Sequence, residues 1–200
     1  MAVDIRIATV ADLDEVSSIL TEAFTHDPLI AWIFADEQSR PRRSAGSYRY
    51  LAEHGYLPHG ASQIVDGRAA ALWLPAGQDG DEHLGARFWV EHHAGYAAAV
   101  EGEIARGLEL NELVAPHVPT DPHRYLFTIG VRRAGQSQGL GGAMLDHALE
   151  AADAAGEAAY LESTTPRSRA LYERHGFEAT GAIELPDGPT LWPMWRPPAT

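Results

Sequence analysis

Residues Tyr125 to Ala155 read YLFTIGV, then RRAGQSQGLGG, then AMLDHALEAADAA, and this stretch decides the fold. The first run is apolar, rich in β-branched residues and ends at Val131, as a buried strand does. A loop with four glycines follows, and an amphipathic pattern opens after Gly142. The first N–H groups of a helix lack intrahelical partners and carry the positive end of its dipole. The stretch therefore predicts a strand, a loop able to hold a phosphate, and a helix.

The loop has the form Q-x-x-G-x-G, from Gln136 to Gly141. Its glycines let a diphosphate approach the backbone without a Cβ in the way, and the N–H groups beyond them can donate hydrogen bonds. It is not a nucleotide P-loop, because it lacks G-K-[ST], and a Rossmann fingerprint fails because Met144 stands where the third glycine would be. By spacing alone, the loop is either an anion site or an ordinary left-handed turn before a helix.

The flanking segments predict further strands and helices around this unit. Gly156 is placed to end the helix, and a second buried strand over Glu157 to Ser163 should run parallel to the first, because a helical crossover joins them. We also expect a strand over 4–9, a helix over 11–24, an apolar lid or wall over 29–34, a helical stretch over 47–57, a hairpin over 61–75 with a type I′ turn at Asp66-Gly67, a turn-rich link over 75–85, mostly helical structure over 86–114, a helix over 164–177 and a closing hairpin over 178–196. Residues 1–200 are expected to form a single domain.

Composition excludes several classes of function. The formal net charge is −13, so clustered cations for a nucleic-acid backbone are not expected. No cysteine occurs, which removes disulfides, thiolate nucleophiles and cysteine-ligated zinc. The N-terminus has acidic residues where a signal peptide would have a basic and then an apolar block, and no run reaches the roughly 18 apolar residues of a membrane span, so we expect a cytoplasmic protein without a membrane partner. The ten histidines include no H-E-x-x-H motif, and no metal site is expected.

A second motif follows one strand later, where residues 170–177 read ALYERHGF. This box and the Q-x-x-G-x-G loop before it resemble, in the expected order, the two signatures of the GCN5-related N-acetyltransferase (GNAT) family. The N-terminal DIRIATVADLDEV also looks like the first strand and helix of that family, so the resemblance covers most of the chain. It implies an α/β fold with a mixed, mostly antiparallel sheet of about seven strands, a parallel and splayed central pair, and helices on both faces.

The resemblance also implies acetyl-CoA as the acyl donor. In the family, the loop N–H groups hold the pyrophosphate and the end of the preceding strand pairs with the pantetheine arm. Relatives often carry Asn where this chain has Ser168, which puts that polar contact in question. The residues assigned to the cofactor are Ile129, Gly130, Val131, Gln136, Ser137, Gln138, Gly139, Leu140, Gly141, Gly142 and Ser168.

For catalysis, Tyr172 falls on the tyrosine that the family uses to protonate the departing thiolate, although an aromatic packed on the core would look the same. The base is left open. Glu162, at the end of its strand, is the first candidate, and a solvated or Arg-paired carboxylate is the competing interpretation. His123, just before the central strand, or a water chain are the other options. A backbone N–H of Ile129 or Gly130 is placed to bind the thioester oxygen.

The aromatic residues Trp32, Phe34 and Trp89 lie in segments where the family builds its acceptor pocket, and we assign them to substrate binding, with core packing as the alternative. Residues 115–131, 160–177 and 184–198 are similar to the puromycin N-acetyltransferase group of the family. We therefore expect direct acetyl transfer to a primary amine of a small molecule, an aminonucleoside antibiotic being one option. The alternatives are a protein or peptide amine as acceptor and a non-catalytic acyl-CoA sensor. A homodimer is left open.

Overall fold

A central sheet draws its strands from both ends of the chain. The computed structural model describes residues 3–77 and 86–199, in which eight strands form one sheet in the order β1-β2-β3-β4-β5-β8-β6, with β7 paired to β8. The strands are β1 (Arg6–Ile7), β2 (Gln63–Val65), β3 (Ala69–Leu74), β4 (His123–Val131), β5 (Ala158–Ser163), β6 (Glu178–Ala179), β7 (Ile183–Glu184) and β8 (Thr190–Arg196). Neighbouring strands are antiparallel except β4 and β5, which run parallel. The predicted mixed sheet with a parallel central pair is confirmed.

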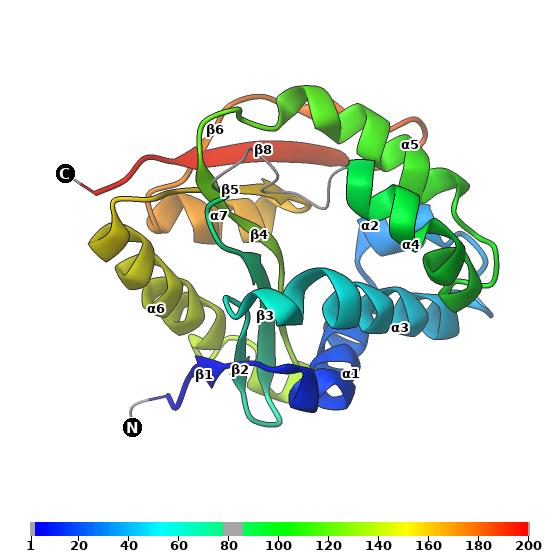
Figure 1. Ribbon diagram of the computed structural model, residues 1–200, viewed down its shortest axis with the longest axis horizontal. Coiled ribbons are helices and arrows are strands. Elements are labelled where there is room, and N and C mark those ends of the chain that lie inside the picture. Colours follow the sequence, from blue (N-terminus) through cyan, green and yellow to red (C-terminus); the bar gives the residue numbers. More distant parts are fainter. Residues whose placement is uncertain (1–2, 78–85, 200) are drawn as a thin grey trace.

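Helices cover both faces of this sheet, with α6 and α7 on one side and α1 and α3 on the other (Figure 1). The helices are α1 (Leu13–Phe24), α2 (Pro28–Ile33), α3 (Arg40–Leu51), α4 (Ala86–Ala99), α5 (Ala105–Val114), α6 (Leu140–Ala155) and α7 (Pro166–Arg174). A π turn, Ala52–Tyr56, directly follows α3. As predicted, Gly156 ends α6 in a left-handed conformation with φ of 67°.

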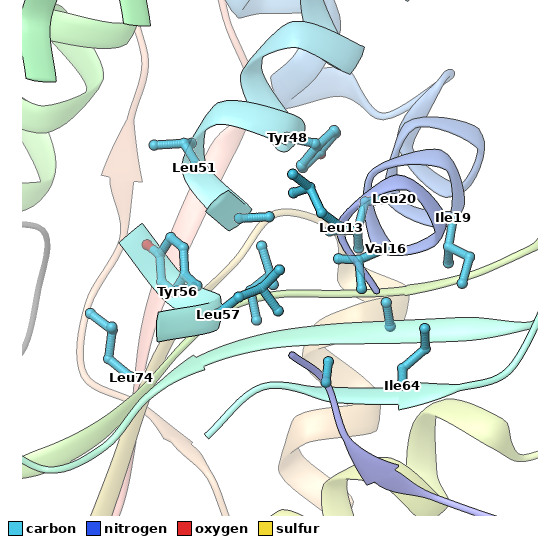
Figure 2. Packing of buried hydrophobic residues seen from close by; sticks show 14 of the residues in the cluster. Leu13, Val16, Ile19, Leu20, Tyr48, Leu51, Tyr56, Leu57, Ile64 and Leu74 are labelled. Atoms are coloured by element: carbon cyan, nitrogen blue, oxygen red, sulfur yellow. The ribbon is translucent and has the colours of Figure 1, made fainter. Parts of the chain in front are cut away.

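Strand β3 shows why the sheet is covered twice. Its sequence AAALWL is buried at every position, which is typical of a strand packed on both faces. Leu72 and Leu74 face the cluster that includes Leu20 of α1 and Tyr48 of α3 (Figure 2). Trp73 points the other way, into the cluster built on α6. The two hydrophobic cores thus follow from the period of two along a strand.

Several boundaries differ from the expectations. The strand predicted over 4–9 is reduced to Arg6–Ile7, because the Asp12 carboxylate accepts the Thr9 N–H at 2.8 Å and starts a helical turn. The central strand begins at His123, since β5 pairs with it from that residue on. The helical stretch predicted over 47–57 already begins at Arg40. Most of the link predicted over 75–85 lies outside the described residues.

The hairpin between β2 and β3 is confirmed, but its type I′ turn is wrong. Gly67 takes φ of 69° while Asp66 does not take a positive φ, and a type I′ turn needs both. The Arg68 N–H closes the turn by donating to the Val65 carbonyl at 2.9 Å. The closing hairpin is also confirmed, because β7 pairs with β8 around residues 185–189.

The two parallel strands separate halfway along β4. They pair from His123 with Ala158 to Leu126 with Leu161, and β4 then continues to Val131 without β5. A register shift explains the change of direction: the pairing of β3 with β4 skips Phe127, and a bulged residue bends its strand and increases its twist. The candidate active site lies beside this split between β4 and β5.

Candidate active site

The glycine loop presents the N-terminus of α6. Gly139 occupies the N-cap with φ of 80°, and Ser137 takes φ of 63°. The Ala143 N–H makes the first helical hydrogen bond, to the Gly139 carbonyl at 2.9 Å. The N–H groups before it, from Leu140 to Gly142, therefore precede the first helical bond, and a helix N-terminus of this kind favours an anion.

A groove of about 430 Å³ lies against this N-terminus. Its wall includes the loop residues Gln136, Ser137, Gly139, Leu140, Gly141 and Gly142, and the strand residues Ile129, Gly130 and Val131. Arg167 and Arg174 add two cations, and the Arg167 guanidinium donates to the Ser137 hydroxyl at 3.3 Å. Cations beside a helix N-terminus fit the phosphates of acetyl-CoA, so this chain has a donor set suited to that cofactor.

One predicted cofactor residue lies apart from the groove wall. The Gln138 amide turns back and donates to the Ala134 carbonyl at 2.8 Å, and Gln138 is not among the residues that line the groove. Gln136 lines it, but its amide also bonds within the loop, to the Val131 carbonyl at 3.2 Å. Both side chains therefore hold the shape of the loop.

A second hollow, of about 250 Å³, lies beside the groove. Its wall is mostly apolar and comes from α1, α2, α3, α4, α5, β4, β5 and α7 and from the loops beside them. The two hollows share Phe24, Ile129, Thr165 and Ser168. The hollow, which we call the acceptor cavity, thus opens onto the groove where β4 has left β5.

The three aromatic residues assigned to substrate binding do not all lie in one place. Phe34 and Trp89 line the acceptor cavity. Trp32 does not, which corrects the prediction: its Nε1 donates to the Pro186 carbonyl at 2.8 Å, and the Arg106 guanidinium lies 4.5 Å from the centre of its ring. It packs with Leu185 in a separate cluster, because successive residues of α2 point to different sides.

Glu162 lies in the wall of the acceptor cavity. The Tyr125 hydroxyl donates to its Oε2 at 2.8 Å. Burial raises the pKa of Glu162 to about 7, and hydrogen bonds from Tyr125 and Tyr160 offset part of that rise. A carboxylate with a pKa near neutrality can accept a proton and release it again. It is not paired with an arginine, as one sequence-based alternative supposed, because no arginine is among the described residues that line the cavity.

Tyr172, on α7, also lines the acceptor cavity and contacts Phe177 edge to face at 6.0 Å between ring centres. Burial first, and the charge of Asp27 second, raise the pKa of Tyr172 above its ordinary value. The phenol therefore keeps its proton at neutral pH. It is a weaker acid than a free tyrosine, but the same apolar surroundings also raise the pKa of a thiol.

Asp27 is a second carboxylate in the cavity wall, and it is not among the site residues predicted from the sequence. It caps α2, with Oδ1 accepting the N–H groups of Leu29 at 2.8 Å and Ile30 at 3.3 Å, and Oδ2 accepting the Thr164 hydroxyl at 3.3 Å. Burial raises its pKa above the ordinary value. An Asp followed by Pro at the first helical position was the available signal.

The remaining candidates are also placed. His123 is fully buried, with Nδ1 2.7 Å from the Asp121 carbonyl oxygen, and it does not line the acceptor cavity. Ser168 lies where groove and cavity meet, and its hydroxyl is 2.9 Å from those of Ser163 and Thr165.

Within residues 3–77 and 86–199, no helix is long and apolar enough to cross a bilayer, and no cluster of acidic and histidine side chains is arranged to hold a metal ion.

Known proteins share this arrangement. A family model described as "Acetyltransferase (GNAT) family" matches residues 68–177. A Corynebacterium glutamicum protein, described as histone acetyltransferase HPA2 and related acetyltransferase, is 26% identical with a TM-score of 0.75, over 100% of this chain and 98% of that one.

Two more distant solved structures show the same fold. Polyamine N-acetyltransferase of Drosophila melanogaster has 17% identity and a TM-score of 0.65, over 97% of this chain and 99% of its own. Arylalkylamine N-acetyltransferase 2 of Aedes aegypti has 15% identity and a TM-score of 0.65, over 97% and 98%. Because the family model spans more than half of the chain, the protein belongs to the acetyltransferase (GNAT) family, whose members take the acetyl group from acetyl-CoA.

Proposed function

We propose that the protein transfers the acetyl group of acetyl-CoA directly to a primary amine of a compact small molecule with an apolar body. The observation that carries this proposal is the acceptor cavity: an apolar hollow of about 250 Å³ that meets the glycine-loop groove and has the carboxylate of Glu162 in its wall. Apolar walls with a few polar groups are typical of small-molecule sites.

The residues divide the chemistry between them. Bound acetyl-CoA supplies a thioester whose carbonyl carbon an amine can attack. Glu162 takes a proton from the ammonium group of the acceptor, so that the nitrogen has a free electron pair. As the C–N bond forms and the C–S bond breaks, the Tyr172 hydroxyl gives its proton to the departing sulfur and regains one from the second N–H of the attacking nitrogen. A backbone N–H of Ile129 or Gly130 binds the carbonyl oxygen. No cysteine is present to form an acyl-enzyme, which supports direct transfer.

The groove side of the proposal assigns the loop N–H groups, Arg167 and Arg174 to the pyrophosphate and phosphates, and the free edge of β4 to the pantetheine arm. Beyond Leu126 that edge has left β5, and an exposed strand edge binds extended chains through its backbone. Ser168 lies at the junction with the acceptor cavity. We place the thioester there.

The size and walls of the cavity favour some acceptors over others. Its volume of about 250 Å³ lies below the usual range of ligand pockets, about 300–1,000 Å³. A small arylalkylamine therefore suits the cavity better than a bulky aminonucleoside. Puromycin, the specific acceptor that the sequence resemblance offers as one option, is kept as a candidate to be tested. The mostly apolar wall also favours a small molecule over a peptide, which would need an open acidic groove.

Free-thiol release from acetyl-CoA tests the proposal. The panel contains 2-phenylethylamine, tyramine, puromycin, spermidine and a lysine-containing peptide. We expect release with the first two amines, slower release with puromycin, and none above background with spermidine, whose charges would lie on apolar walls. Binding of acetyl-CoA without release for any amine would refute the proposal and favour the sensor.

A further inference from the structure

Two phenols converge on the carboxylate of Glu162. Tyr125 and Tyr160 are register partners across β4 and β5, with their rings stacked at 6.2 Å between centres. Glu162 follows Tyr160 by two positions, so both side chains leave the same face of β5. The Tyr125 hydroxyl donates to Glu162 Oε2 at 2.8 Å, and the Tyr160 hydroxyl interacts with the same carboxylate. The two phenols therefore come from the last paired part of the sheet.

Glu162 lies where β4 and β5 separate. The two strands stop pairing after Leu126 and Leu161, so Glu162 is the first β5 residue beside the split. Tyr125 and Tyr160 are 8% and 0% exposed, so their hydroxyls have little access to water. Phenylalanine would satisfy packing alone at both positions, and a buried hydroxyl is costly unless it is hydrogen-bonded.

We propose that Tyr125, assisted by Tyr160, is a positioning residue for Glu162: its hydroxyl holds Oε2, so that Oε1 receives the proton of the acceptor ammonium. This inference rests on the proposed function. The only transfer it involves is that of one proton, from the acceptor nitrogen to Glu162 Oε1. The hydrogen bond to Oε2 stabilises the ionised carboxylate and fixes its rotamer, both of which a base needs before the amine binds.

Other titratable groups around the carboxylate must be separated from this effect. They are Asp27 before α2, Tyr48 on α3, Tyr56 in the π turn, His93 and Tyr96 on α4, and Tyr172 on α7. Because several titratable groups face the carboxylate, a rate profile alone does not identify Glu162. A direct titration of its carboxyl group is needed.

The experiment compares Tyr125→Phe and Tyr160→Phe with Tyr50→Phe, a matched control whose hydroxyl contacts His92 outside the acceptor cavity. Carbon-13 NMR of glutamate side-chain carboxyls, assigned with Glu162→Gln, gives the pKa of Glu162 in the free protein. The pH profile of kcat and kcat/KM is then measured with 2-phenylethylamine. The same amine is used throughout, so its own ionisation cancels in the comparison.

Losing a donor to the anion should raise the pKa of Glu162 by roughly one unit in Tyr125→Phe and by less in Tyr160→Phe. The ascending limb of the rate profile should move by the same amount, while Tyr50→Phe leaves both unchanged. A Glu162 pKa that does not move in Tyr125→Phe would overturn the inference, and so would a pKa that moves while the rate profile stays fixed. Absence of acetyl transfer to every amine would instead refute the proposed function and would leave the NMR titration readable.

Discussion

The groove and the acceptor cavity meet at Ile129 and Ser168 but are built in different ways. The groove centres on one continuous segment, and its recognition groups are backbone N–H groups at the start of α6. The cavity is lined by side chains of α1, α2, α3, α4, α5, β4, β5 and α7, and its polar groups include the carboxylates of Asp27 and Glu162. A site that binds through backbone N–H groups keeps its ligand when nearby side chains are substituted, whereas a site lined by side chains changes its preference with each substitution. We therefore expect substitutions to leave acetyl-CoA binding largely unchanged and to alter which amines are accepted.

Glu162→Gln is expected to separate the two hollows most clearly. Loss of the base should lower kcat by about 100-fold or more, while the Kd of acetyl-CoA stays within roughly twofold, because the loop N–H groups are untouched. Steady-state kinetics and calorimetry measure the two quantities. Glu157→Gln, directly before the first residue of β5 and paired with Arg124, is the control and should leave kcat unchanged. An equal loss in both variants would remove Glu162 from the mechanism.

Tyr172→Phe alters the wall of the acceptor cavity. We expect kcat to fall roughly 30-fold, since proton donation to the sulfur is lost, with little change in the affinity for acetyl-CoA. A leaving group of lower pKa needs less help, so a thioester of a more acidic thiol should recover part of the rate. Unchanged turnover across the pH range would assign Tyr172 to packing alone.

The pH dependence of folding provides a test without substrate. The pKa of Glu162 is about 7 in the folded protein, above its value of about 4.3 in an unfolded chain. Its contribution to stability is therefore fully present below pH 4.3 and is lost as pH rises towards 7. Relative to the wild type, Glu162→Gln should gain on the order of 2 kcal/mol between pH 5 and pH 8 in urea unfolding. A constant difference would show that the carboxyl group is not buried in solution.

Gly139→Ala tests the groove and has the smallest expected effect. Its φ of 80° costs an alanine about 1 kcal/mol, so we expect roughly fivefold weaker binding of acetyl-CoA and an unchanged KM for the amine. Gly60 has φ of 68° and open space around it, so Gly60→Ala carries the same strain away from the site. Weaker binding in both variants would mean that the loop effect is global.

How far the sequence predicts each hollow follows from the same difference. The glycine loop, Gly156 and the parallel crossover are local patterns, and all of them appear in the structure. The acceptor cavity depends on which side of a helix each residue faces. Trp32 was therefore misplaced, and Asp27 was not predicted as a site residue because its hydrogen bond to Thr164 joins residues far apart in the chain.

The hydrogen-bond partners of Glu162 could not be predicted from the sequence either. The contact with Tyr125 depends on strand register, and the split that exposes the carboxylate depends on the bulge at Phe127. Neither leaves a signal in a single sequence, because both arise only when two strands are placed side by side.

The close packing of Gly188 against Trp32 links the C-terminal hairpin to the shape of the acceptor cavity. A Cβ at Gly188 would lie 2.5 Å from the Trp32 ring, and Trp32 shares α2 with Ile30 and Ile33 in the cavity wall. Substitutions at the tip of the C-terminal hairpin should therefore displace α2 and reshape the cavity without altering any residue that lines it. Natural variation or directed evolution could retune the range of amines from more than 150 residues away in the chain, and a comparison of lining residues alone would miss the cause.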